Sequence, residues 1–190
     1  MSMHRPFITD REGPAQRMRV DPGQTGFFAG RMFRTYLEQV IPVAGPAVSA
    51  RFTSPVDFIL WQQEISLTQG ALRLEVFTGA TPSGTWTALP SIGVNRMSER
   101  PLYGGSYYTS VCTAEYGGSF TGGTAVDLIL ARSSTNQGLI SSSNVGGAQS
   151  SERGLPAGTY YIRFSTLTGG VAVNDAAQMI YSILWEERVP

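Results

Sequence analysis

The chain has 190 residues, of which 42% are hydrophobic, and its formal net charge at pH 7 is zero. This length suits one domain with a sizeable core, and the balanced charge gives no sign of a preference for nucleic acid or an anionic membrane, so we expect neither as a partner. Only 15% of the residues are charged, against a usual value of about 25%, while 22 Gly and 11 Pro indicate short strands and many turns.

The first thirty residues differ in composition from the rest of the chain. They are rich in Pro and Gly and show neither the period of a strand nor that of a helix. We interpret residues 1–30 as an extended N-terminal arm that is ordered against a neighbouring subunit, and residues 31–190 as one β-sandwich domain. A passive terminal tail is the alternative. The candidate partner-binding residues of the arm are Arg17, Arg19, Phe27 and Phe28.

Two strands are predicted between the arm and the middle of the chain. The first covers residues 32–41 and is closed by Pro42, because proline cannot continue a ladder. The second covers residues 47–52 and ends at Ser54-Pro55.

The stretch Val56 to Phe77 organises the predicted fold, because two alternating runs flank a turn. Alternation of this kind is the signal of a half-buried strand. The residues Thr68-Gln69-Gly70 supply turn chemistry between the runs, so we expect a β-hairpin. The side chains that we expect to share its buried face are Ile59, Trp61, Gln63, Ile65 and Leu67 in the first run and Leu72, Leu74 and Val76 in the second.

The second half of the chain continues the pattern of short strands and turns. Strands are predicted over residues 85–89, 106–116, 124–132, 159–165 and 178–185, with a helical turn as the alternative for 124–132. The run 85–89 is expected to be an edge strand, because Pro90 follows it, and in 159–165 we expect Tyr160, Ile162 and Phe164 to share one face. Loops or irregular segments are predicted over residues 78–84, 91–105 and 117–123, with a long polar stretch over 133–154. About eight or nine strands and no predicted helix favour an all-β fold, an antiparallel β-sandwich of the jelly-roll or immunoglobulin-like type.

The scarcity of histidine and cysteine limits the chemistry. His4 is the single histidine and Cys112 the single cysteine, so a Cys–His pair, a Ser–His–Asp triad and a His-based zinc site all lack parts. No internal disulfide can form either. We interpret Cys112, at the end of an apolar run, as a buried strand thiol rather than a nucleophile, and we predict no cofactor and no metal.

Acidic and aromatic residues offer two further hypotheses. A hydrolase would need two carboxylates facing one another across a cleft, although ion pairs with Arg73, Arg132 or Arg163 are the simpler use of these acids. A glycan-binding module would stack aromatic rings on sugars. The carboxylates considered are Asp57, Glu64, Glu75, Glu115 and Asp127. The tyrosines that we consider as a glycan or partner surface are Tyr103, Tyr107, Tyr108 and Tyr116.

Targeting signals and basic residues bear on where the protein folds and what it binds. The first residues lack the apolar stretch of a secretory signal, and no run reaches the roughly 20 apolar residues that span a bilayer. We therefore expect folding in a reducing cytoplasm. All 14 basic residues are Arg, which fits either a coding bias or the enrichment of Arg over Lys at interfaces.

A series of segments along most of the chain resembles small structural proteins encoded by tailed bacteriophages. The segments are FFAGRMFRTYLEQVIP, FTSPVDFIL, VFTGATPSGTW, VNRMSERP, GGSFTGGTAVDLI, ERGLPAGTYYIRF and the final LWEER. The resemblance implies a virion component, either a capsid decoration protein or a part of the tail or its attachment apparatus, folded in the host bacterial cytoplasm. It supplies no catalytic residues.

The sequence therefore predicts a non-enzymatic virion structural protein. We expect its partners to be capsid or tail subunits and further copies of itself. The alternative is a glycan-binding, receptor-binding module on a tail fibre.

Overall fold

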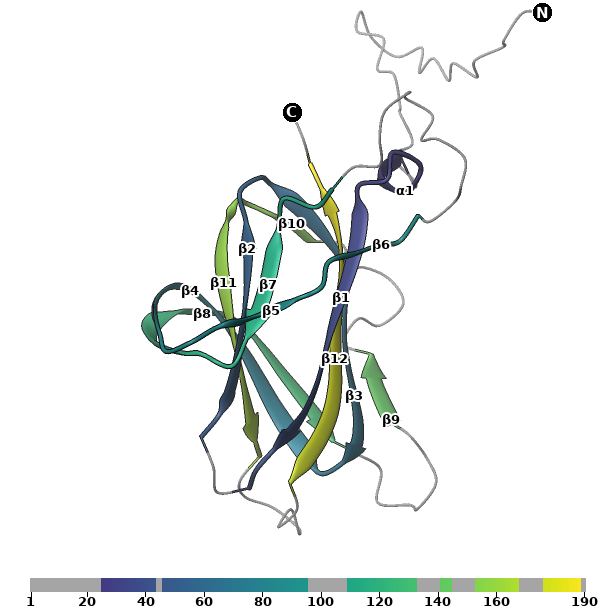
Figure 1. Cartoon of the computed structure of the whole chain (residues 1–190). Helices are drawn as coiled ribbons and strands as arrows, with labels where there is room; N and C mark the ends of the chain where they lie inside the picture. Colours follow the sequence, from purple (N-terminus) through teal and green to yellow (C-terminus); the bar gives the residue numbers. More distant parts are fainter. Residues whose placement is uncertain are drawn as a thin grey trace, which may run out of the picture.

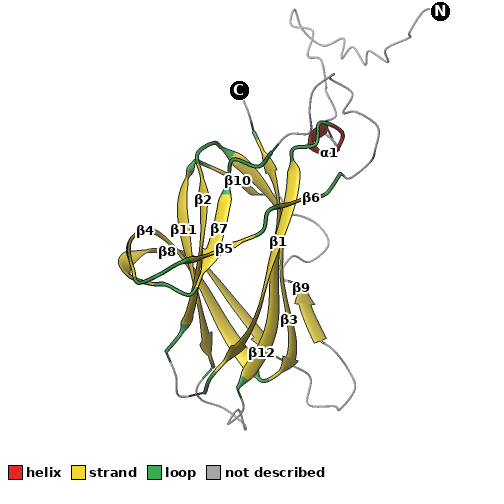
Figure 2. Ribbon diagram, viewed as in Figure 1, coloured by secondary structure: helices red, strands yellow, loops and turns green. Residues whose placement is uncertain are grey.

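The computed structural model describes residues 25–43, 46–95, 109–132, 141–144, 153–167 and 176–188. In this part of the chain, two antiparallel β-sheets pack face to face (Figure 1). Strands and connecting loops account for nearly all of it, with a single helical turn near the N-terminus (Figure 2). The prediction of an all-β fold made of two packed antiparallel sheets is confirmed.

The first sheet, sheet A, has the strand order β10-β3-β12-β1-β6, and β9 also pairs with β3. The second, sheet B, has the order β5-β7-β2-β11-β4-β8. The strands of sheet A are β1 (Met32–Ile41), β3 (Phe58–Gln69), β6 (Ile92–Gly93), β9 (Ser141–Asn144), β10 (Arg153–Leu155) and β12 (Ala177–Glu187). Those of sheet B are β2 (Val48–Ser54), β4 (Ala71–Ser83), β5 (Thr87–Leu89), β7 (Thr113–Tyr116), β8 (Ser119–Arg132) and β11 (Gly158–Thr166).

The predicted hairpin between the two central runs is wrong, because β3 belongs to sheet A and β4 to sheet B. Gly70 alone joins them, with a φ of 81° that L side chains rarely adopt. A Cβ atom at this position would lie 3.0 Å from the Cα of Ala177, at the start of β12. The turn signal in the sequence was real, but it marks a tight corner from one sheet to the other.

The buried face of β3 also differs from the prediction in its first half. The β12 ladder pairs Leu184 with Gln62 and Trp185 with Leu60, so Trp61 is an extra residue without a partner opposite it. Such a β-bulge shifts the alternation by one residue. Phe58 and Leu60 therefore lie in the core in place of Ile59 and Trp61, whereas Gln63, Ile65 and Leu67 are buried as predicted. On β4, Leu72 and Leu74 are buried and Val76 packs against the core.

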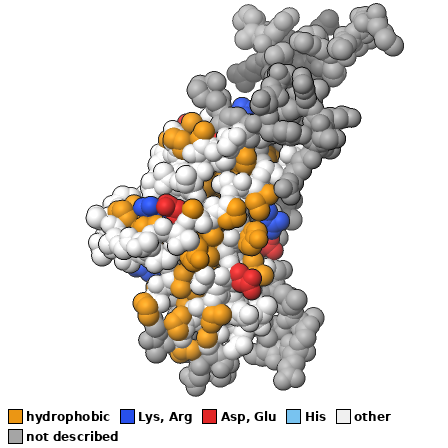
Figure 3. Space-filling model, viewed as in Figure 1, with side chains coloured by type: hydrophobic (Ala, Val, Ile, Leu, Met, Phe, Trp, Pro, Cys, Tyr) orange, Lys and Arg blue, Asp and Glu red, His pale blue; other side chains and the backbone are white. Residues whose placement is uncertain are grey.

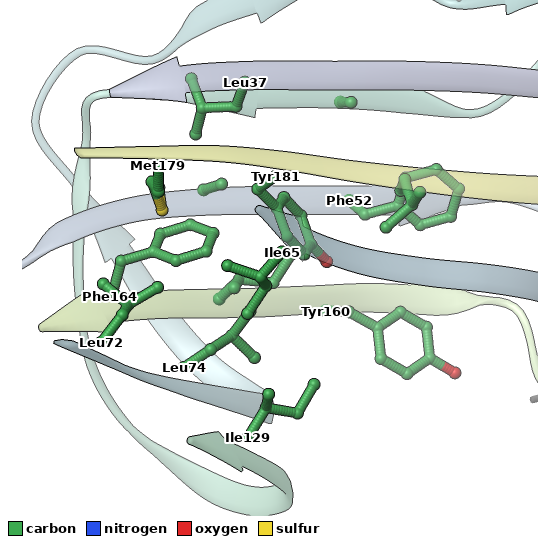
Figure 4. Close-up of a cluster of buried hydrophobic side chains, with 14 of the residues drawn as sticks. Leu37, Phe52, Ile65, Leu72, Leu74, Ile129, Tyr160, Phe164, Met179 and Tyr181 are labelled. Carbon is green, nitrogen blue, oxygen red and sulfur yellow. The ribbon is translucent and has the colours of Figure 1, made fainter. Parts of the chain in front are cut away.

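The core lies between the two sheets (Figure 4). Leu37 of β1, Ile65 of β3 and Met179 of β12 point from sheet A toward Leu72 and Phe164 of sheet B. Aromatic rings add contacts of 5.0–5.9 Å between ring centres, which lie in the range favoured by edge-on and tilted pairs. These pairs are Phe33–Trp185, Phe52–Phe58, Phe52–Trp185, Phe58–Tyr160 and Phe164–Tyr181.

Strands β4 and β8 extend through segments that the sequence predicted to be loops. The ladder continues through Gly79 and Gly122 to the pair Ser83–Ser119, and both glycines have positive φ angles of 67° and 68°. A register shift after Val76 adds a further irregularity. These features bend the paired strand ends, which we call the flap (residues 79–83 and 119–123), away from the sandwich (Figure 1).

Other boundaries also differ from the sequence prediction. Strand β7 begins only at Thr113, so Ser110 and Cys112 lie before it, and residues 96–108 are outside the described part. The polar stretch 133–154 contains β9 and the start of β10. In contrast, β1 has the predicted bounds, and β5 is an edge strand as expected.

The end of the predicted arm is a helical turn rather than an extended segment. Thr25–Phe28 forms α1, the amide of Arg31 donates to the carbonyl of Gly26 over 2.8 Å, and the amide of Glu187 donates to the carbonyl of Arg31 over 3.1 Å. Gly26 packs against the Glu186 carboxylate, where a Cβ atom would collide. Residues 1–24 are outside the described part, so the division at Gly30 stays a prediction.

The corner at Gly70 gives a first testable prediction. Gly70→Ala should lower the free energy of unfolding by more than the roughly 1–2 kcal/mol that a positive φ costs an L residue, because the added methyl group also presses on β12. Gly79→Ala is the matched control, since Gly79 has a similar φ and open space around it. Chemical denaturation should show a larger loss for Gly70→Ala, and equal losses would contradict the packing argument.

Candidate functional site

Strand β8 carries apolar side chains on both of its faces. Ile129 and Ala131 point into the core and are buried. Val126, Leu128 and Leu130 alternate with them and are 52%, 53% and 55% exposed. We call these three residues the β8 row. An antiparallel strand with one solvated face normally alternates apolar and polar residues, so the β8 row is the clearest candidate contact surface of the described part.

The surroundings of the β8 row suit a protein contact. β8 is one of the two edge strands of sheet B. Leu128 pairs with Glu75 and Leu130 with Arg73 on β4, and Arg73 donates to Glu75 over 2.6 Å. The row is therefore an apolar strip beside an ion pair whose two charges neutralise one another. This arrangement resembles the apolar centre and polar rim of protein interfaces.

The outer face of sheet A is a second, more mixed surface. A groove there is lined by Arg34, Tyr36, Ile92, Ile180 and Ser182. Tyr36 and Ile180 are exposed, but Arg34 spans the groove and donates to the Ser182 hydroxyl over 3.2 Å. Figure 3 shows that charged side chains form only small groups on the face of the molecule drawn there.

The outer face of sheet B beside β11 is covered by the protein itself. Phe120 of the flap packs on Tyr161, with ring centres 5.2 Å apart, and both are buried. The guanidinium of Arg163 lies 4.8 Å from the ring centre of Phe77 and 4.7 Å from that of Phe120, a cation–π arrangement. These aromatic side chains are used inside the fold and leave little ring surface for a sugar.

Most of the site residues predicted from the sequence lie outside the described part. These are Arg17, Arg19, Tyr103, Tyr107, Tyr108 and the side chain of Phe28. Phe27 is partly buried, and its carbonyl accepts a hydrogen bond from the Asn95 amide over 3.1 Å. Tyr116 packs against the core from β7. The structure does not bring Phe27 and Tyr116 together, and the partner and glycan roles of all these residues stay predictions.

The carboxylates considered for hydrolysis mostly have other partners. Glu75 pairs with Arg73 as predicted, while Glu115 pairs with Arg51 over 2.5 Å and Asp127 with Arg153 over 2.7 Å. Asp57 accepts the backbone amide of Ala157, and Glu64 accepts the side-chain amide of Gln62. Arg163 contacts aromatic rings rather than an acid.

Two adjacent carboxylates at the end of β12 are buried, which the polar ending Glu186-Glu187-Arg188 did not suggest. Glu186 accepts the indole N–H of Trp61 over 3.1 Å. Glu187 accepts the Ser110 hydroxyl over 2.5 Å and the backbone amides of Val111 and Cys112 over 3.2 and 3.3 Å. These bonds attach the segment before β7 to the last strand of sheet A.

The hydrogen bonds to Glu187 decide its ionisation. Burial by itself would raise the pKa of this carboxyl, but the bonds from Ser110, Val111, Cys112 and Trp185 outweigh burial and lower the pKa below its ordinary value.

At Cys112 burial is the larger effect, and it raises the pKa of the thiol to about 12. Cys112 is buried as expected, and its Sγ donates to the Ser54 hydroxyl over 3.2 Å.

The described residues contain neither a metal-binding cluster nor a membrane-spanning helix. No cluster of three or more His, Cys, Asp or Glu side chains suited to a metal ion occurs among them. In the same residues, no helix has the length and apolar character needed to cross a membrane.

Glu187 should make the fold acid-sensitive. A carboxyl with a lowered folded pKa stabilises the protein above its unfolded pKa, and this contribution is lost as the pH falls through the folded value. Glu187→Gln should lower the free energy of unfolding at pH 7 by about 2 kcal/mol or more and flatten its decline below about pH 4.5. Urea denaturation between pH 3 and 7 measures both, with Glu38→Gln, which changes an exposed carboxyl of β1, as control. Parallel pH profiles for wild type and Glu187→Gln would contradict this assignment.

Cys112 should be unreactive in the folded protein. The buried, protonated thiol should react with DTNB at pH 8 on the order of a thousandfold more slowly than in the unfolded chain, because the thiolate is the reacting form. The release of thionitrobenzoate with and without guanidinium measures the ratio. Rapid labelling of the native protein would contradict the burial of this thiol.

Comparisons with known proteins identify no relative from which a role can be transferred. No family model matches the chain, and no curated protein and no solved structure matches it either. The functional conclusion therefore depends on the sequence pattern and on the surfaces of the structure.

Proposed function

We propose that this protein is a non-enzymatic structural component of a tailed-bacteriophage particle. In this role it binds capsid or tail subunits, as a decoration or attachment protein, and self-associates. The observation that carries the proposal is the β8 row, an exposed apolar strip on an edge strand. Such strips mark contact surfaces, because water is a poor environment for contiguous apolar side chains.

The sandwich is of the jelly-roll type in this proposal. In a jelly roll the chain alternates between sheets, so that the first strand pairs with the last and the second with the one before last. Here β1 pairs with β12 and β2 with β11. The core orders β1-β12-β3-β10 and β2-β11-β4-β8 support this type. Viral capsid domains are among the proteins that use it, which agrees with a virion role.

The composition also supports assembly. Arg supplies every basic side chain of the sequence, and Arg is the cation that protein interfaces favour. In the described part, Arg51, Arg73 and Arg153 each form an ion pair with an acid. The exposed apolar strip on β8 would gain free energy from burial against a partner.

The location of the protein is the direct test of the proposed function. Purified phage particles from cells that carry this gene should contain the protein, as measured by mass spectrometry. Cryo-electron microscopy should show a β-sandwich of this strand order on the capsid or the tail. Absence from particles would overturn the proposal.

The contact surface can be tested by substitution. Leu128→Glu with Leu130→Glu should abolish incorporation into particles, because charges on the β8 row would be buried without partners. The melting temperature should change little, since these sites are exposed in the free protein. Val40→Glu is the matched control on the outer face of sheet A, where Val40 is also exposed, and it should incorporate normally. Incorporation of the double variant at wild-type occupancy would show that β8 is not the contact.

A further inference from the structure

A cavity of about 460 Å³ lies between the two sheets; of the β8 row only Val126 lines it, and the proposed contact does not use its interior. It is lined from both sheets, by β3, β10 and β12 on one side and by β2, β4, β8 and β11 on the other. Its volume is within the range of about 300–1,000 Å³ that small-molecule sites occupy. A close-packed interior leaves few voids larger than a water molecule, so a space of this size needs an explanation.

The mouth of the cavity is spanned by an ion pair. Asp127 on β8 and Arg153 on β10 both line the cavity, and the carboxylate and guanidinium are 2.7 Å apart. β8 is an edge of sheet B and β10 an edge of sheet A. The pair therefore joins the two sheets at an open edge and leaves no net charge there.

The walls are largely apolar, and their polar side chains away from the Asp127–Arg153 pair are Thr78, Tyr160 and the pair Gln63–Tyr181. Leu60, Val76, Ile162 and Ile183 are among the aliphatic lining residues. Gln63 and Tyr181 also line the cavity, and the Gln63 side-chain amide donates to the Tyr181 hydroxyl over 3.1 Å. The hydroxyl accepts this bond, which leaves its own proton for an acceptor within the cavity.

The two tyrosines of the wall differ in whether their hydroxyl proton is already used in a hydrogen bond. Tyr160 donates its proton to the carbonyl of Pro156 over 2.8 Å. Burial raises the pKa of Tyr181 well above its ordinary value, so its hydroxyl keeps the proton at neutral pH. Of the two tyrosines, Tyr181 is therefore the one whose hydroxyl proton remains for a guest, and Tyr160 contributes its ring to the wall.

We propose that this cavity binds an uncharged, largely apolar small molecule that carries a carbonyl or ether oxygen. The oxygen accepts the Tyr181 hydroxyl, and the hydrocarbon part occupies the aliphatic wall. A charged guest is disfavoured because the interior offers no counter-charge and the groups at the mouth already neutralise one another. A purely hydrocarbon guest would bind but would leave the Tyr181 proton unused.

The experiment titrates the purified full chain with prodan, an uncharged naphthyl ketone whose emission shifts to the blue in apolar surroundings. The expected result is saturable binding of one prodan per chain with a blue shift. Val76→Phe in the wall and Leu155→Trp at the mouth should each weaken binding at least about tenfold by filling the space. Leu128→Ser, on the outer face of β8, is the control and should bind like wild type.

The hydrogen bond is tested separately. Tyr181→Phe should weaken prodan about three- to tenfold, the usual range for one lost hydrogen bond. It should leave the affinity of 2-ethylnaphthalene, which has no acceptor, unchanged in a displacement assay. If Tyr181→Phe destabilises the fold through the unpaired Gln63 amide, Gln63→Met combined with Tyr181→Phe removes both polar groups and gives the same comparison.

Two results would overturn the inference. The first is no saturable prodan binding to the folded wild type at concentrations up to about 1 mM, the weak limit of specific affinity; the cavity is then filled by the chain itself. The second is loss of binding in Leu128→Ser with normal binding in both cavity-filling variants, which would place prodan on the outer surface.

Discussion

The packing of apolar side chains between the two sheets is the constraint on which the rest of the structure depends. Successive central strands alternate between the sheets, so no short hairpin holds β3 to β4 or β1 to β2. Each strand is secured by partners that are distant in sequence and by the core beneath it. The corner at Gly70 joins β3 of sheet A to β4 of sheet B through a single residue with positive φ. Each of the two strands is held in its own sheet by its buried side chains.

The sequence allowed the fold class and most strands to be predicted, because the apolar–polar alternation of a strand and the Gly and Pro residues that end it are local signals. The bounds of β1 and the inward face of β11 followed from them. Sheet membership is not a local property, so the corner at Gly70 looked like a hairpin. The bulge at Trp61 was hidden too, because it arises from a mismatch with β12, more than a hundred residues away. The glycine-rich segments of the flap were predicted to be loops, because their pairing with one another is not visible in either segment alone.

The candidate contact surface was harder to see than the core. Residues 124–132 were correctly predicted to be a strand, but the apolar run 128–131 within them does not reveal which side chains remain exposed. Only the burial of Ile129 and Ala131 identifies the β8 row as the outer set. Likewise, Glu187 looks like a solvated terminal charge in the sequence, whereas the structure surrounds it with donors from the segment before β7.

The pairing of β1 with β12 has a consequence for synthesis on the ribosome. Sheet A has β1 and β12 side by side at its centre, so the ladder cannot close until the residues of β12 have left the exit tunnel. During that interval, which lasts on the order of ten seconds at ordinary elongation rates, the emerged β1 can pair only with the two residues of β6. Charged side chains on an unpaired strand disfavour its pairing with another chain, and β1 carries Arg34 and Glu38 on its outward face.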